Sequence, residues 1–205
     1  AQLVLSGVYD GLVNGYDEGY GVAVSPSGSI YVSGQIDRAE VARAFDIIVV
    51  GYGRDGSYAW ENQYYAPGGE VDVGYGIARG PAGDLYATGV AGKKLWMGAF
   101  SATGAALWTK TVAGAAGLPC DGRGIAVDAS SSIYVAGRDL RQDLGQGDNL
   151  VLSKYSSSGS LIWSVNYNSP ANSGEAGYAV AVGGAGEVYV AGYETRTDLG
   201  QDRNV

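Results

Sequence analysis

The 205-residue sequence predicts an all-β fold built from repeated four-stranded antiparallel units. Three observations support this class. A glycine-rich segment of 16 residues recurs four times in register. The apolar runs are short and rich in Val, Ile and Tyr, which favour strands. No segment shows a convincing helix period. Units of four strands with a period of about 50 residues are typical of the blades of a β-propeller.

The recurring segment predicts the first two strands of each unit. It reads GYGVAVSPSGSIYVSG in its first copy, and successive copies are 55, 48 and 55 residues apart. A turn residue, a central tyrosine and a closing glycine keep their places in every copy. We therefore expect a hairpin in each copy, with turn residues such as glycine and serine at its tip. The four copies are residues 19–34, 74–89, 122–137 and 177–192.

A second recurring block predicts the third and fourth strands. Trp60, Trp108 and Trp163 each precede the next hairpin by 14 residues, and Leu5 takes the same place before the first hairpin. Each Trp follows a glycine by four residues and an aromatic residue by eight. The runs on either side of that glycine predict strand three and strand four. Trp96 lies outside this series, and we expect it to be a packed residue of strand three.

These strands predict one propeller domain, or a fragment of one, over residues 1–205. About four blade repeats are visible, three complete and one split between the termini. Three explanations fit the split blade. The chain is a fragment of a larger ring, or two chains complete an eight-bladed assembly, or the chain forms a small four-bladed ring with an imperfect closing blade. Unpaired strand edges make self-association possible. The expected blades are residues 19–65, 74–112 and 122–167, with strand four of a blade at 1–9 and a partial blade at 177–205.

The motifs G-Y-G-V-A-V, P-S-G-S-I-Y-V-S-G and G-x-x-x-W together resemble the SBBP-type β-propeller repeat of bacteria and archaea. The resemblance covers nearly the whole chain. It implies a propeller fold and a location that is extracellular or at the cell surface. It implies no single activity.

Composition excludes several kinds of chemistry. Histidine is absent and Cys120 is the only cysteine, which excludes a Ser-His-Asp triad, a Cys-His dyad, an internal disulfide and a cysteine metal cluster. The formal net charge of -8 disfavours nucleic acid and anionic membranes as partners. No apolar run approaches the roughly 18 residues of a membrane span, so we expect no membrane insertion. Cys120 is expected in a loop, without a role, and no cofactor is expected unless calcium binds.

The candidate binding residues lie on one face of the predicted propeller. The loops from strand two to strand three, and from strand four to the next blade, emerge on the same face. These loops vary in length and hold most of the charges, whereas the turns of the opposite face are short and uniform. Variable loops on a rigid scaffold commonly bind ligands. The candidates on this face are Asp17, Glu18, Asp72, Asp121, Glu175, Arg141 and Arg196.

One loop of this face occurs twice, as residues 139–146 and 194–201, and both copies contain Arg, then Asp-Leu-Gly-Gln. Two interpretations are open. The carboxylates could supply hard oxygen ligands to calcium. Alternatively, the Arg and the Asp pair across a tight turn and fix it, which is the favoured interpretation. The calcium candidates are Asp143, Asp148, Asp198 and Asp202.

The sequence favours a non-catalytic extracellular interaction module that binds a protein or a glycan through the acidic, variable loop face. Tyrosine rings beside carboxylates suit sugars or polycations, although blade packing also explains many of the tyrosines. One alternative is a structural repeat of a cell-surface or filament assembly. A second alternative is a propeller hydrolase or lyase with carboxylate acid-base residues. Because no carboxylate pair stands out, the sequence does not decide whether the protein is an enzyme, and it favours a protein without catalytic activity.

Overall fold

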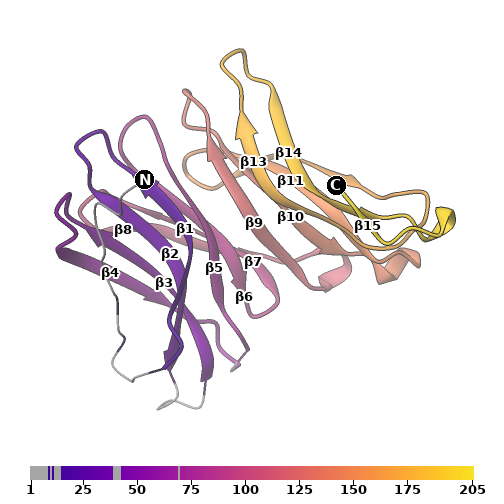
Figure 1. Ribbon diagram of the computed structural model, residues 1–205, viewed down its shortest axis with the longest axis horizontal. Coiled ribbons are helices and arrows are strands. Elements are labelled where there is room, and N and C mark those ends of the chain that lie inside the picture. Colours follow the sequence, from indigo (N-terminus) through magenta and orange to yellow (C-terminus); the bar gives the residue numbers. More distant parts are fainter. Residues whose placement is uncertain (1–8, 10, 12–14, 39–42, 69) are drawn as a thin grey trace.

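The computed structural model describes residues 9, 11, 15–38, 43–68 and 70–205. Apart from Tyr9, the strand expected over residues 1–9 lies outside these residues. Four antiparallel sheets stand side by side along an arc (Figure 1), three of them with four strands and one with three. The predicted all-β propeller architecture is therefore confirmed. Within the described residues the arc does not close, because β13 and β1 share no extensive contact.

The strands of each blade are consecutive in the sequence and adjacent in the sheet. Blade one contains β1 (Glu18–Val24), β2 (Ile30–Arg38), β3 (Arg43–Tyr52) and β4 (Tyr58–Tyr64). Blade two contains β5 (Val73–Arg79), β6 (Leu85–Ala91), β7 (Lys94–Phe100) and β8 (Ala106–Val112). Blade three contains β9 (Cys120–Val127), β10 (Ile133–Leu140), β11 (Asp148–Tyr155) and β12 (Leu161–Tyr167). Blade four contains β13 (Glu175–Val182), β14 (Val188–Thr195) and β15 (Arg203–Asn204).

We call the first strand of each blade, β1, β5, β9 or β13, its inner strand. Every inner strand carries a β-bulge at the same position, just after the first glycine of the recurring segment. The closing glycine of strand two makes this bulge possible. In blade two, a Cβ on Gly89 would lie 1.9 Å from the carbonyl oxygen of Val73, and the other three blades give the same clash at 1.9 to 2.0 Å. Only glycine fits under that carbonyl, which explains why the residue recurs four times. The bulged residues are Tyr20, Tyr75, Arg123 and Tyr178.

The second glycine of the recurring segment lets neighbouring inner strands approach each other. A Cβ on Gly21 would lie 2.9 Å from the backbone nitrogen of Ile77, and a Cβ on Gly124 would lie 2.7 Å from the Cα of Ala179. β1, β5, β9 and β13 contact one another in that order. Each pairs with a strand of its own blade on one side only, so the other edge faces the centre of the arc.

The core lies between consecutive blades, and the tryptophans connect them. The indole N–H of Trp60 donates to the carbonyl oxygen of Ala102 in blade two at 3.2 Å, and that of Trp108 donates to Ser157 in blade three at 3.0 Å. The Trp60 ring lies against Gly104, where a Cβ would come within 2.6 Å of it. Gly104 and Gly159, four residues before Trp108 and Trp163, thus each receive the Trp of the preceding blade. Trp96 is fully buried in β7, as predicted.

The strands begin earlier than the sequence suggested, because pairing continues past the bulge. Glu18, Asp121 and Glu175, expected in loops, lie on the inner strands β1, β9 and β13. The expectation that Cys120 lies in a loop was wrong, since it is the first residue of β9 and is buried. Its thiol donates to the carbonyl oxygen of Val112 at 3.2 Å. No helix in the described part of the chain is both long and apolar enough to cross a membrane.

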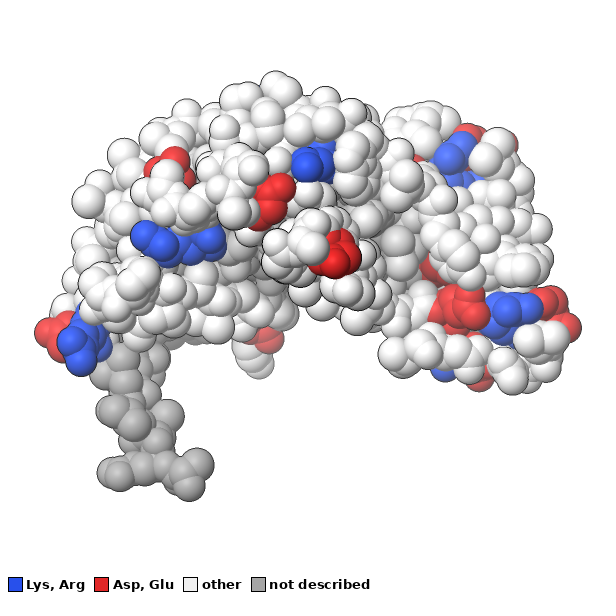
Figure 2. All heavy atoms as spheres, turned by 90° about the horizontal axis from the view of Figure 1, so that it is seen from above, with Lys and Arg blue, Asp and Glu red and all other residues white. Residues whose placement is uncertain are grey.

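The two ends of the blades differ in character. The hairpin turns between first and second strands lie at the top of Figure 1, and Figure 2 views the molecule from that side. Charged side chains are few and scattered on this face, and most of it is uncharged (Figure 2). The inner strands begin at the opposite end, where the bulges and the candidate binding residues are.

Candidate functional site

Three positions in each blade meet where the inner strands begin, and we call this group the axial mouth. They are the residue before the first glycine, the bulged residue, and the residue after the closing glycine of strand two. The scaffold around them repeats, but their chemistry does not. The axial mouth consists of Glu18, Tyr20 and Gln35 in blade one, Val73, Tyr75 and Val90 in blade two, Asp121, Arg123 and Arg138 in blade three, and Ala176, Tyr178 and Tyr193 in blade four.

The bulged side chains form a continuous row across the four blades. The rings of Tyr20 and Tyr75 meet edge to face with centroids 5.7 Å apart. The guanidinium of Arg123 lies 5.6 Å from the Tyr75 ring and 4.9 Å from the Tyr178 ring, so it is flanked by both. Tyr178 contacts Tyr193 at 5.7 Å. Tyr20 and Tyr178 keep 49 % and 45 % of their surface exposed, so their rings are accessible to a ligand.

A small open cavity of about 180 Å³ adjoins this row, and all four inner strands line it. Val22, Ile77, Ile125 and Val180 form its apolar walls, and the glycines of the inner strands contribute bare backbone. Because the inner strands are edge strands, N–H and C=O groups on this side have no partner strand. The cavity therefore offers apolar surface, backbone hydrogen-bonding groups and aromatic rings together.

In blade three, charges at the axial mouth neutralise each other. Asp121 is 3 % exposed and accepts hydrogen bonds from Arg123 Nε at 3.0 Å and Arg138 Nε at 2.7 Å. Arg138 also donates to Asp148 at 2.8 Å. Burial by itself would lower the pKa of Arg123 and Arg138, but the hydrogen bonds and charge of Asp121 outweigh it and raise both pKa values. This network holds the Arg123 side chain in place between its flanking rings.

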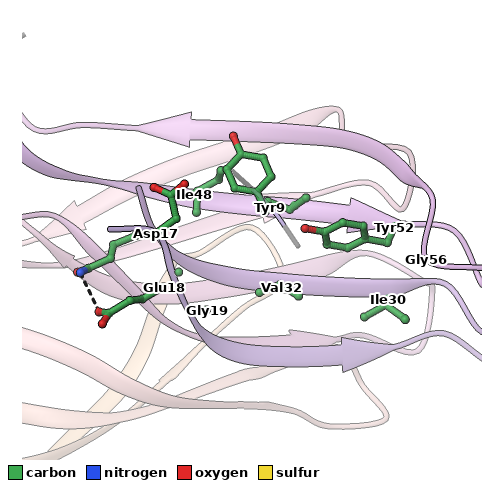
Figure 3. Close-up of a pocket in the computed structure, with 12 residues that line it drawn as sticks. Tyr9, Asp17, Glu18, Gly19, Ile30, Val32, Ile48, Tyr52 and Gly56 are labelled. Carbon is green, nitrogen blue, oxygen red and sulfur yellow. Dashed lines mark hydrogen bonds between the residues drawn. The ribbon is translucent and has the colours of Figure 1, made fainter. Parts of the chain in front are cut away.

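In blade one, the equivalent carboxylate has neutral partners. The Tyr20 hydroxyl donates to Glu18 Oε2, and Gln35 Nε2 donates to the same oxygen at 3.0 Å (dashed line in Figure 3). The bond to Glu18 raises the pKa of Tyr20 to about 12, so Tyr20 stays a donor at neutral pH. Within the described part of the chain, no Lys or Arg forms an ion pair with Glu18.

Two other carboxylates that the sequence proposed for ligand binding accept hydrogen bonds from backbone N–H groups. Asp17 accepts the backbone N–H of Gly11 at 2.6 Å and of Asp37 at 3.1 Å. Asp72, at the equivalent place in blade two, accepts the N–H groups of Ala66 and Gly92. Each carboxylate thus connects the approach to its inner strand with the end of strand two.

Glu175 occupies the same position in blade four and is fully buried. It accepts a hydrogen bond from the Ser169 hydroxyl at 2.7 Å. Of the five carboxylates that the sequence proposed for ligand binding, only Glu18 is exposed; Asp17 is half-buried and Asp72, Asp121 and Glu175 are buried.

The duplicated loops are fixed by internal ion pairs. Arg141 donates two hydrogen bonds to Asp143, at 3.0 and 3.1 Å. Arg196 donates two to Asp198, at 2.9 and 2.8 Å. In each loop the Arg holds the pKa of the Asp below its usual range. Each pair spans a short 3-10 helix, Gln142–Leu144 or Thr197–Leu199. The two arginines predicted to bind ligand are therefore engaged within their own loops.

The remaining calcium candidates do not join these pairs into a cluster. Asp148 accepts from Arg138, and Asp202 is exposed, with its backbone carbonyl oxygen accepting from Asn204. Among the residues that the structure describes, no group of three or more His, Cys, Asp or Glu side chains is arranged to hold a metal ion.

A larger pocket of about 450 Å³ lies over the sheet of blade one (Figure 3). Its body is apolar, and Asp17, Glu18 and Gln35 form its polar end. The apolar lining is Ile30, Val32, Ile48, Val50 and Tyr52. Four of the corresponding residues of blade two, Leu85, Ala87, Trp96 and Phe100, belong to the core between blades one and two. The wall of this pocket therefore has the composition of a surface that packs against another blade. The side chains that could bind a polar ligand lie at its polar end, next to the axial mouth.

The sequence did not show that Tyr20, Tyr75 and Tyr178 form a row with Arg123. One signal was available. All four residues occupy the middle of the G-x-G or G-x-A motif, a position that holds tyrosine in three blades and arginine in blade three. Gln35 and its equivalents on strand two also belong to the axial mouth. They can be assigned to it only once the pairing register of strands one and two is known.

By its fold, the chain is a propeller-type repeat protein. Tyrosine rings line its axial mouth. No family model matches the chain, and no curated protein matches it. Among solved structures, the crystal structure of a protein of unknown function from Bacteroides caccae is similar, with a TM-score of 0.57 at 16 % sequence identity. The match covers 85 % of this chain and 53 % of that protein, so the chain spans about half of its length. This likeness supports the fold alone.

Proposed function

We propose that this chain is a non-catalytic binding module that holds a carbohydrate at the axial mouth. The observation that carries the proposal is the row of Tyr20, Tyr75, Arg123 and Tyr178 beside a cavity lined by four strand edges. Aromatic faces suit the C–H faces of sugar rings, and backbone N–H and C=O groups suit sugar hydroxyls. A binding role for a protein or a glycan at this end of the propeller follows the expectation from the sequence.

The pattern of repetition within the chain supports a binding role for the axial mouth. Positions that the fold needs, such as the central tyrosine and the closing glycine, are the same in all four blades. The axial mouth carries acid, base, aromatic and aliphatic residues at equivalent positions. A scaffold alone would gain nothing from this diversity, whereas a ligand with unlike groups on its sides requires it.

The proposal assigns no catalysis. Each buried candidate acid has a structural donor: backbone N–H groups for Asp72, two arginines for Asp121 and a serine hydroxyl for Glu175. An extracellular or cell-surface location is part of the proposal and rests on the resemblance of the repeat. The net charge of -8 supports partners other than nucleic acid.

A glycan-array screen followed by calorimetry of the best ligand tests the proposal. Replacing both Tyr20 and Tyr178 by alanine removes the two exposed rings of the row, and we expect the affinity to fall about tenfold or more. Tyr58→Ala is the matched control, because Tyr58 is 56 % exposed on β4 and lies outside the axial mouth. A glycan that binds the double variant as tightly as the wild type would contradict the proposal, as would the absence of any glycan ligand.

A second candidate function is a structural unit that associates with itself, and one observation favours it. β12 exposes 57 % of Leu161, 37 % of Trp163 and 55 % of Val165, whereas Trp60 and Trp108 donate into a following blade. Exposed apolar faces of this kind mark association sites. Sedimentation at increasing concentration tests it: a larger mass that disappears in a Trp163→Ser and Val165→Ser double variant supports assembly, and a constant monomer contradicts it.

A further inference from the structure

We propose that Glu18 makes the axial mouth selective for a protonated amine, so that its ligand is an oligosaccharide of amino sugars. This inference rests on the proposed carbohydrate-binding function and adds the charge of the ligand to it. Blades one and three carry a carboxylate at the same position of the repeat, and in blade three it binds two arginines.

Blade three shows what this position does when the chain supplies a cation. Asp121 binds the guanidinium groups of Arg123 and Arg138, which occupy the bulged position and the position after the closing glycine. The Arg123 guanidinium is at the same time flanked by two tyrosine rings, 5.6 and 4.9 Å away. A carboxylate on one side and aromatic faces on the other are a favourable environment for a cation.

Blade one has a carboxylate at the same position, and among the side chains that the structure describes no cation pairs with it. Its two partner positions hold Tyr20 and Gln35, which are neutral and orient Glu18 through Oε2. Within the described residues no hydrogen bond reaches Oε1. Glu18 is exposed, unlike Asp121, and the Tyr20 ring lies beside it. A ligand cation at Oε1 would receive the carboxylate contact that Arg123 receives from Asp121, next to the Tyr20 side chain.

The other charges of the axial mouth argue against an anionic sugar. Both of its guanidinium groups are already bound, to Asp121 and to Asp148, so a ligand carboxylate or sulfate would have to displace an internal partner. The formal charge of the whole chain is -8, which also attracts cationic ligands and repels anionic ones. An amino sugar combines the ammonium group that suits Glu18 with the ring face that suits Tyr20 and Tyr178.

The test compares two oligosaccharides of equal length, one of glucosamine and one of N-acetylglucosamine, by calorimetry at a pH where the free amine is protonated. They share a backbone and differ in charge. We expect the wild-type protein to bind the amine form roughly tenfold more tightly. In Glu18→Gln this ratio should fall to about one. Glu187→Gln, which removes an exposed carboxylate from a turn on the opposite face, should keep the wild-type ratio.

The outcomes separate this inference from the function on which it rests. Equal binding of the two oligosaccharides by the wild type would overturn the amine selectivity and leave the carbohydrate-binding function standing. Binding of neither would overturn the carbohydrate-binding function and the inference with it. A tenfold preference that persists in Glu18→Gln would show that overall charge attracts the amine and would also overturn the role of Glu18. Thermal denaturation of both variants checks that the fold is intact.

Discussion

Replacing Gly89 by alanine tests whether the closing glycine permits the bulge that presents Tyr75. A Cβ at this position would lie 1.9 Å from the carbonyl oxygen of Val73 and 2.9 Å from its carbonyl carbon. Val73 is 4 % exposed and packed, and the obstacle is backbone instead of a flexible side chain. The strand pair must therefore separate by about 1 Å or lose the bulge, since carbon and oxygen atoms do not approach closer than about 3 Å.

The expected cost follows from two opposing terms. Forcing an extra methyl into a packed site costs about 1 to 3 kcal/mol, and a backbone obstacle places this site at the upper end. Alanine also restricts the unfolded chain, which returns about 0.4 to 1 kcal/mol. We expect Gly89→Ala to lower the free energy of unfolding by about 2 kcal/mol.

Urea denaturation followed by tryptophan fluorescence measures this change, with Gly184→Ala as the matched control. Gly184 lies in the turn between β13 and β14, and a Cβ there meets no atom within 4 Å. The control should change stability by less than about 0.5 kcal/mol. If Gly89→Ala is as stable as Gly184→Ala, the argument that the closing glycine permits the bulge is wrong.

Three further predictions concern residues at the contacts between blades. Trp108→Phe should cost about 1 kcal/mol more than Trp163→Phe, because the Trp108 indole donates to Ser157 and no such bond is found for Trp163 within the described residues; equal losses of stability in urea would contradict this. Burial raises the pKa of Cys120 from 9.0 to about 11, so the native thiol should react with iodoacetamide at pH 8 far more slowly than the thiol in urea. Because the pKa is raised in the folded state, the stabilisation is complete below about pH 9 and is lost as the pH rises toward 11, which denaturation midpoints measured across this range would reveal.

The sequence predicts the blades well because their residues are dictated by local geometry. The closing glycine avoids a carbonyl oxygen, the turn residue of the hairpin adopts a positive φ, as Gly28 does at 93°, and Trp60 and Trp108 each pack against a glycine in the next blade. Such requirements recur with the period of the fold. They can therefore be recognised from four copies in one chain.

The candidate site was harder to predict because charge alone does not indicate which way a side chain faces. Asp72 and Glu18 are close to the same glycine-tyrosine motif in sequence terms, yet Asp72 is 1 % exposed and Glu18 is exposed. The two acids occupy adjacent positions of the repeat, Asp72 two residues and Glu18 one residue before the first glycine, and adjacent residues of an extended chain point to opposite sides. Asp72 then reaches the backbone of the adjacent segments, as Asp17 does, and is used there.

The four bulges also bear on function, because they are expensive features to keep. Each interrupts the ladder between an inner strand and its neighbour, and each requires within a strand a glycine, a residue that loses more conformational freedom on folding than alanine does. What the bulge provides in return is one side chain per blade directed into a shared row. In blade two that side chain is Tyr75, and its neighbours Val73 and Val90 are aliphatic, whereas blade three surrounds Arg123 with charge. The recurring distortion is therefore structural in origin, and the side chains that it presents are where the blades differ. A ligand would meet that difference first.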